Sequence, residues 1–75
     1  MIVSPNPVEQ NFKIILNDVS AKKLIIRNSM GNTVMQLPFQ YGRQIFFANM
    51  IAGTYSIIAL DDNNKLIAKT TFLKK

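Results

Sequence analysis

Apolar and polar residues alternate along most of this chain, and turn residues separate the alternating stretches. Alternation with a period of two indicates strands with one buried face, and no stretch has the 3.6-residue repeat of an amphipathic helix. The connections are also too short for the helical crossovers that a parallel sheet needs. The stretches predicted as strands are residues 12–16, 22–28, 33–37, 44–48, 54–60 and 65–73.

Short strands that recur roughly every ten residues, without helices, predict an all-β fold. We expect an immunoglobulin-like antiparallel β-sandwich of about seven short strands, and a five-stranded closed barrel is the alternative. The residues expected to form the core are Phe12, Ile14, Leu16, Leu24, Ile26, Val34, Ile45, Tyr55, Ile57, Ala59 and Phe72.

The last third of the chain carries the most distinctive local pattern. Gly53 and Tyr55 open the most apolar strand, a polar turn at residues 61–64 follows, and a strand rich in lysine closes the chain. A tyrosine at a strand start is typical of a tyrosine corner, in which the hydroxyl bonds to upstream backbone. The alternative is that Tyr55 is an exposed recognition ring. The lysines of the closing strand either protect a sheet edge or form a recognition strip.

Turn residues shape two further segments. Ser4-Pro5-Asn6-Pro7 lacks two ladder donors, so we expect a rigid opening segment and not a central strand. Residues 28–32 form a predicted hairpin loop, in which Gly31 can adopt a positive φ.

Length and hydropathy favour one small domain. The chain has 75 residues, 48% of them hydrophobic, and we expect residues 1–75 to be a single domain cut from a longer protein. No run approaches the ~20 apolar residues of a membrane-spanning helix, so direct membrane insertion is not expected. Met1-Ile2-Val3 lacks the basic start and apolar stretch of a signal peptide.

Composition also limits the chemistry. Histidine and cysteine are absent, which removes the usual general base, the commonest metal ligand and thiolate chemistry. Of the four acidic residues only Asp61 and Asp62 adjoin, and neighbours on a strand face opposite sides. We therefore expect a non-catalytic domain with no cofactor and no metal.

Positive charge and aromatic residues leave binding functions open. The formal charge is +5, which suits either a solvated surface or an acidic partner. Phe39, Tyr41 and Phe47 lie near Arg43 and are the expected platform of a carbohydrate-binding or adhesion module. The alternative is that one ring of the Phe46-Phe47 pair is buried. A nucleic-acid-binding barrel is a third interpretation, but the cations are scattered and only two are arginine, so no nucleic acid is expected.

In their order, several motifs resemble those of the type A C-terminal sorting domains of proteins exported by the type IX secretion system of Bacteroidetes. Pro5-Asn6-Pro7 is similar to the Pro-Asn-Pro segment near which those domains begin. Residues 28–31 are similar to an Asp-x-x-Gly turn, with Asn28 in place of Asp and Gly31 retained. Asparagine keeps the capacity for an Asx turn and loses a charge.

The resemblance continues to the end of the chain. Residues 50–55 are similar to a Leu-Pro-x-Gly-x-Tyr bend, with Met50-Ile51 in place of Leu-Pro. Residues 65–75 are similar to the lysine-rich terminal strand, with Lys69 and Lys74 at matching positions. The likeness thus covers nearly the whole chain.

This resemblance implies a folded secretion signal at the end of a larger N-terminal passenger. An outer-membrane secretion translocon would recognise the domain, and a sortase-like protease would remove it upstream of or near Pro5-Asn6-Pro7. The protein would pass through the periplasm to the cell surface or the extracellular medium. The residues expected to contact the translocon are Gly53, Tyr55, Lys65, Lys69, Lys74 and Lys75.

Overall fold

The computed structural model describes residues 1–75 and contains seven strands. It has no helix long and apolar enough to cross a membrane. The strands are β1 (Ile2–Ser4), β2 (Asn11–Ile15), β3 (Lys23–Asn28), β4 (Thr33–Pro38), β5 (Gln44–Phe46), β6 (Gly53–Leu60) and β7 (Leu66–Lys74).

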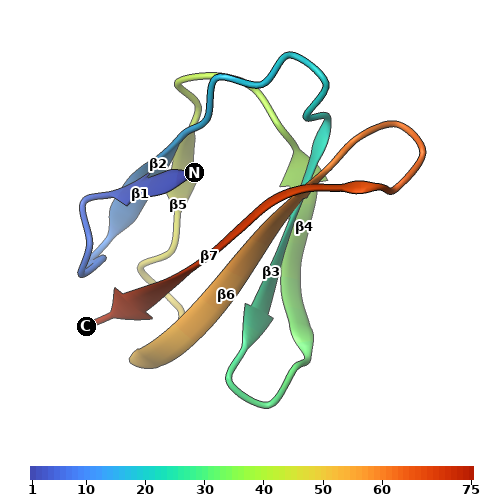
Figure 1. Cartoon of the computed structure of the whole chain (residues 1–75). Helices are drawn as coiled ribbons and strands as arrows, with labels where there is room; N and C mark the ends of the chain where they lie inside the picture. The colour runs from blue at the N-terminus through green and yellow to red at the C-terminus, as the bar shows by residue number, and fades with distance from the viewer.

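The strands form two sheets that pack face to face (Figure 1). One sheet has the order β1-β2-β5 and the other has the order β4-β3-β6-β7, with antiparallel ladders throughout. The prediction of an antiparallel β-sandwich is confirmed, and the closed barrel is wrong. The immunoglobulin-like topology stays a prediction, because β4 lies beside β3, whereas constant-type immunoglobulin sandwiches place the fourth strand in the other sheet.

Strand positions follow the alternation of the sequence closely, with three main differences. The predicted strand 44–48 is shorter, because β5 ends at Phe46. Ile2–Ser4 forms β1, which pairs with β2, although no strand was predicted there. The closing strand begins at Leu66, because Lys65 belongs to the preceding turn, where its N–H donates to Asp61 Oδ1 at 2.9 Å. A register shift between Ala59 and Leu60 accompanies this turn.

Four aromatic rings join the two sheets at the centre of the core. Phe12 lies on β2 and Phe47 follows β5, while Tyr55 and Phe72 lie on β6 and β7. The ring centroids of Phe12 and Phe72 are 5.0 Å apart, and those of Phe47 and Tyr55 are 4.9 Å apart. Such pairs add about 0.5–1.5 kcal/mol each to the stability gained from area burial. The contacts therefore fix β7 against the opposite sheet.

Most of the predicted core is confirmed. Nine of its eleven residues are buried, whereas Leu16 and Val34 are only partly buried and pack against the others. The buried apolar residues that the pattern missed are Val3, Val8, Ala21, Phe47 and Leu60.

Truncation of Ile57, which is fully buried on β6, should destabilise the domain strongly. We expect Ile57→Ala to lower the free energy of unfolding by about 2–5 kcal/mol, because methylenes are lost and a cavity remains. Val19, which is 94% exposed, supplies the matched control: Val19→Ala should change stability by less than about 0.5 kcal/mol. Urea denaturation measures both, and an unchanged midpoint for Ile57→Ala would show that β6 is not central.

Candidate functional site

The β6–β7 hairpin is the most extensively paired part of the domain. Its register runs from Gly53 opposite Lys74 to Leu60 opposite Leu66. One face of the hairpin carries Tyr55, Ile57 and Phe72 into the core. Figure 1 shows β7 at the edge of its sheet, beyond β6. Of the predicted site residues at the end of the chain, Lys69 and Lys74 therefore lie on an edge strand, and Lys65 and Lys75 flank it.

The bend before β6 is a tyrosine corner. The Tyr55 hydroxyl donates to the Ile51 carbonyl oxygen at 2.5 Å, and the Tyr55 side chain is buried. Gly53 has a φ of +153°, a conformation that residues with a Cβ rarely adopt. This structural interpretation of Tyr55 is confirmed, and the alternative of an exposed recognition ring is wrong.

The four predicted lysines do not form one surface. Lys65, Lys69 and Lys75 are exposed, but Lys74 is 6% exposed and lies on the core face of β7. Lys74 pairs with Gly53, and its Nζ donates to the Lys75 carbonyl oxygen at 2.6 Å. A lysine stem can pack on apolar surface while its ammonium reaches a polar partner. The Lys74 side chain therefore lies on the core face, unlike the other three lysines, and its contact with a translocon stays a prediction.

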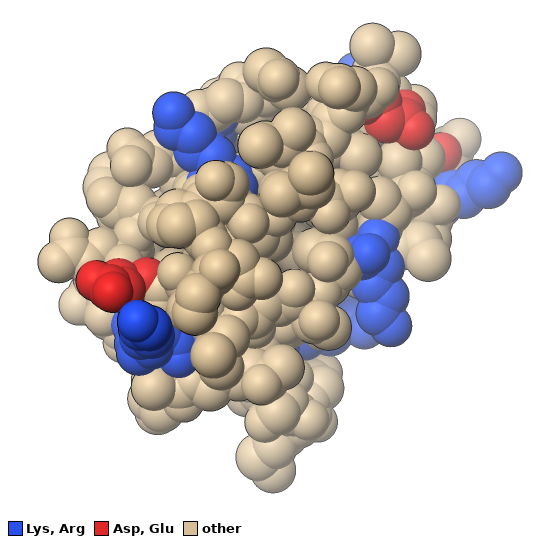
Figure 2. Space-filling view, turned by 60° about the vertical axis from the view of Figure 1, so that its left-hand side comes forward, with Lys and Arg blue, Asp and Glu red and all other residues tan.

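Positive charge is also dispersed over the rest of the surface. Figure 2 shows lysine and arginine side chains as separate patches on the face it presents, with acidic side chains among them. One such pair joins Lys75 Nζ to Glu9 at 3.8 Å. The view offers no continuous basic groove of the kind that tracks a nucleic-acid backbone.

The Pro5-Asn6-Pro7 segment lies against the end of β7. Leu73 N–H donates to Asn6 Oδ1 at 3.1 Å, and Val8 N–H donates to the Leu73 carbonyl oxygen at 2.7 Å. Lys75 N–H donates to the Val8 carbonyl oxygen at 2.8 Å, so Val8 forms a parallel bridge with β7. We call residues 6–9 the clamp segment. It lies in the connection between β1 and β2 of the smaller sheet, and its hydrogen bonds tie that connection to β7 of the larger sheet. The segment predicted to open the chain is therefore part of the fold.

The sequence predicted only some features of the clamp segment. The prolines correctly excluded a central strand, and both X-Pro bonds are cis. The role of Val8 was missed, because one apolar residue between Pro7 and Glu9 has no periodic context. Val8 is nevertheless fully buried.

The predicted hairpin loop after β3 has the expected turn chemistry. Asn28 Oδ1 accepts hydrogen bonds from Met30 N–H and Asn32 N–H, each at 3.0 Å. Gly31 has a φ of +85°, so the predicted positive φ is confirmed. Asn28 lies opposite Tyr55 in the β3–β6 ladder, so this loop and the tyrosine corner share one end of the sheet.

That end of the larger sheet carries an open depression of about 410 Å³. The hairpin loop, the start of β6 and the outer face of β7 all contribute to it. The lining residues are Arg27, Asn28, Ser29, Gly31, Thr54, Tyr55, Ser56 and Thr71. Three of the segments predicted from the motifs therefore meet on one surface.

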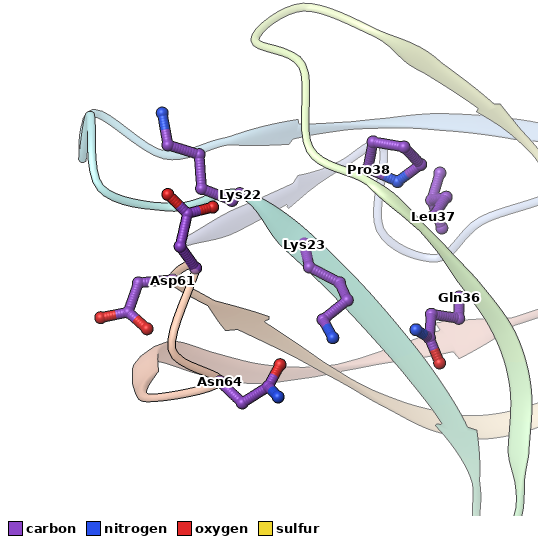
Figure 3. Close-up of a pocket in the computed structure, with 8 residues that line it drawn as sticks. Lys22, Lys23, Gln36, Leu37, Pro38, Asp61 and Asn64 are labelled. Atoms are coloured by element: carbon purple, nitrogen blue, oxygen red, sulfur yellow. The ribbon is translucent and has the colours of Figure 1, made fainter.

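A second polar depression, of about 360 Å³, lies at the opposite end of the sheet (Figure 3). Figure 3 shows the Lys23, Gln36 and Asn64 side chains directed toward the same space. Asp61 also lines it, but its Oδ1 already accepts N–H donors from Asn63 and Lys65 within the turn. The Asp61 carboxylate thus stabilises the hairpin turn.

The groups that could support catalysis or metal binding are widely separated. No three Asp or Glu residues gather in a way that could hold a metal ion. The pKa of Asp18 is lowered by the hydrogen bond from the Ser20 hydroxyl and then by that from the Ser20 N–H. This carboxylate is exposed in the loop between β2 and β3, so the shift reflects a local turn.

The predicted aromatic platform for polysaccharide is wrong. Phe47 is 1% exposed and belongs to the central aromatic cluster, whereas its neighbour Phe46 is 72% exposed. The alternative, in which one ring of this pair is buried, is confirmed. Tyr41 is exposed, but the three rings do not form a flat surface together because Phe47 is inside.

Residues 3–73 match the family described as the secretion system C-terminal sorting domain. The chain belongs to this family. No curated protein and no solved structure matches the chain. Sorting domains of this family direct cargo to a secretion system, so the chain is the sorting part of a secreted cargo protein that the secretion machinery recognises. The resemblance inferred from the motifs is therefore confirmed.

Loss of the Asn6 side chain should loosen the end of β7 in this sorting domain. Asn6→Ala leaves Leu73 N–H without its acceptor, and we expect a loss of about 1 kcal/mol in stability. The Leu73 amide should also exchange faster with solvent, measured by hydrogen–deuterium exchange. Asn6→Asp retains the acceptor oxygen and is the matched control. Unchanged exchange at Leu73 in Asn6→Ala would contradict the clamp.

Proposed function

We propose that this domain is a folded, non-catalytic C-terminal secretion signal whose β6–β7 hairpin is recognised by a type IX outer-membrane translocon. Membership of the sorting-domain family supports the transport role. One observation supports the choice of this hairpin. The clamp segment, the tyrosine corner and the closing strand are distant in sequence but meet at β7. The family motifs therefore all contribute to the β6–β7 hairpin.

The role of the motifs in this proposal is to set the shape of the hairpin. Tyr55 hydrogen-bonds to Ile51, and Gly53 permits the bend, so both act through backbone geometry. Among the lysines, Lys65, Lys69 and Lys75 are exposed and can contact the translocon directly. Lys74 acts from the buried face, where it holds the end of the strand.

We further propose that a sortase-like protease removes the domain by cutting upstream of Ile2. A cut within Pro5-Asn6-Pro7 would separate β1 from the rest of the sandwich, because β1 pairs with β2. A cut upstream of Ile2 leaves all seven strands and the clamp intact. The passenger would precede this point, pass through the periplasm with the domain, and reach the cell surface or the extracellular medium.

Deletion of Leu73-Lys74-Lys75 should trap a fused passenger in the periplasm. The deletion removes the partners of the clamp segment and the strand end opposite Gly53, so the hairpin loses its shape. Cell fractionation and immunoblotting of an export-competent host measure the passenger in the periplasm and in the medium. Val19→Ala, a change at a fully solvated loop position, is the control that should be exported normally. Normal export of the deletion would end the proposal.

A further inference from the structure

The outer edge of β7 is divided into a covered half and an open half. The backbone groups of Leu73 and the N–H of Lys75 point away from β6 and are bonded to the clamp segment. Beyond Leu73, toward the start of the strand, the clamp segment ends and no other strand pairs with β7 on this side. Only the last part of the edge is therefore occupied.

The ladder register identifies which groups are open. Successive residues of a strand direct their N–H and C=O groups to opposite sides, and the register with β6 has no shift from Lys74 to Ala68. Thr71 and Lys69 therefore point the same way as Leu73. None of the 12 backbone hydrogen bonds outside the ladders involves Thr71 or Lys69. These two residues present two donors and two acceptors at the open edge.

Charge on this edge favours a particular partner. Lys69 is exposed at the centre of β7, and no acidic residue lies on the strand. Self-pairing of two β7 edges centred on Lys69 would bring two Lys69 side chains close together, and like charges across a strand pair are destabilising. A strand that carries a carboxylate would instead gain a favourable pair with Lys69.

We propose that an extended, acidic segment of the secretion machinery pairs as an added strand with β7 at Lys69 and Thr71. This inference rests on the proposed function and locates the contact at the open half of the edge. Backbone hydrogen bonds would bind the segment, and its side chains would provide specificity, as in other complexes formed by strand addition. The clamp segment sets the limit of the pairing, because it already occupies Leu73 and Lys75.

Thr71→Pro tests this proposal in a passenger fusion. Proline removes the outward N–H at Thr71, whereas the ladder bonds to β6 use Thr70 and Phe72, and proline is tolerated on the outer side of edge strands. We expect export to fall about five- to tenfold, the effect of losing a net hydrogen bond. Thr71→Val keeps the N–H and is the matched control, so it should be exported better than Thr71→Pro, and the difference between the two isolates the backbone donor. A cooperative melting transition of each variant verifies folding.

Two further measurements keep the test decisive if Thr71→Pro fails to fold. Lys69→Glu keeps the backbone donor and reverses the charge, so it should reduce export, while Lys69→Gln should have the smaller effect. In the unsubstituted domain, the Thr71 amide should exchange rapidly. It should become protected when outer membranes solubilised from an export-competent host are added.

The outcomes distinguish a failure of strand pairing from a failure of the proposed secretion signal. Normal export of folded Thr71→Pro, or of Lys69→Glu, together with trapping of the Leu73-Lys74-Lys75 deletion, overturns strand pairing and leaves the secretion signal in place. Normal export of all these variants overturns both. Protection of Thr71 that rises with the concentration of the isolated domain would show that a second copy occupies the edge, which also overturns the acidic partner.

Discussion

The packing of four aromatic rings between the sheets is the interaction on which the rest of this structure depends. Phe12 and Phe47 come from the smaller sheet, and Tyr55 and Phe72 come from the β6–β7 hairpin. A chain this short buries only roughly 60% of the surface that its unfolded form exposes, so few contacts carry its stability. Because Phe72 lies in this cluster, the edge strand β7 is held by the whole core as well as by its ladder with β6.

Distant motifs have one common effect in this fold, which is to order the closing strand. The tyrosine corner fixes the start of β6, and the clamp segment hydrogen-bonds to the end of β7. Lys74 is buried opposite Gly53, and its Nζ donates to the Lys75 carbonyl oxygen at the same end of the strand. In the function proposed above, the shape of this hairpin is the secretion signal, and its recognition needs no reactive side chain.

The sequence predicted six of the seven strands, because alternation over five or more residues reports a buried face directly. It missed β1, whose three residues are too few to show a period before the prolines begin. The site was predicted less well. Burial of Lys74 could have been inferred, since it shares a face with Phe72, but its charge suggested exposure. The clamp contacts could not be inferred from the sequence, because they join Asn6 to Leu73 near the opposite end of the chain.

The central claim is that the hairpin is recognised while folded, and a disulfide across it tests this most directly. Ser56 lies opposite Thr71 in the β6–β7 ladder, and the chain has no cysteine, so Ser56→Cys with Thr71→Cys places a single cross-link. The periplasm is oxidising, so the bond should form during transit. Fractionation of cells that carry a passenger fused to this variant measures its export. We expect the locked hairpin to be exported as well as the unmodified domain. Retention in the periplasm that a reducing agent relieves would show that the hairpin must open, and would contradict the account.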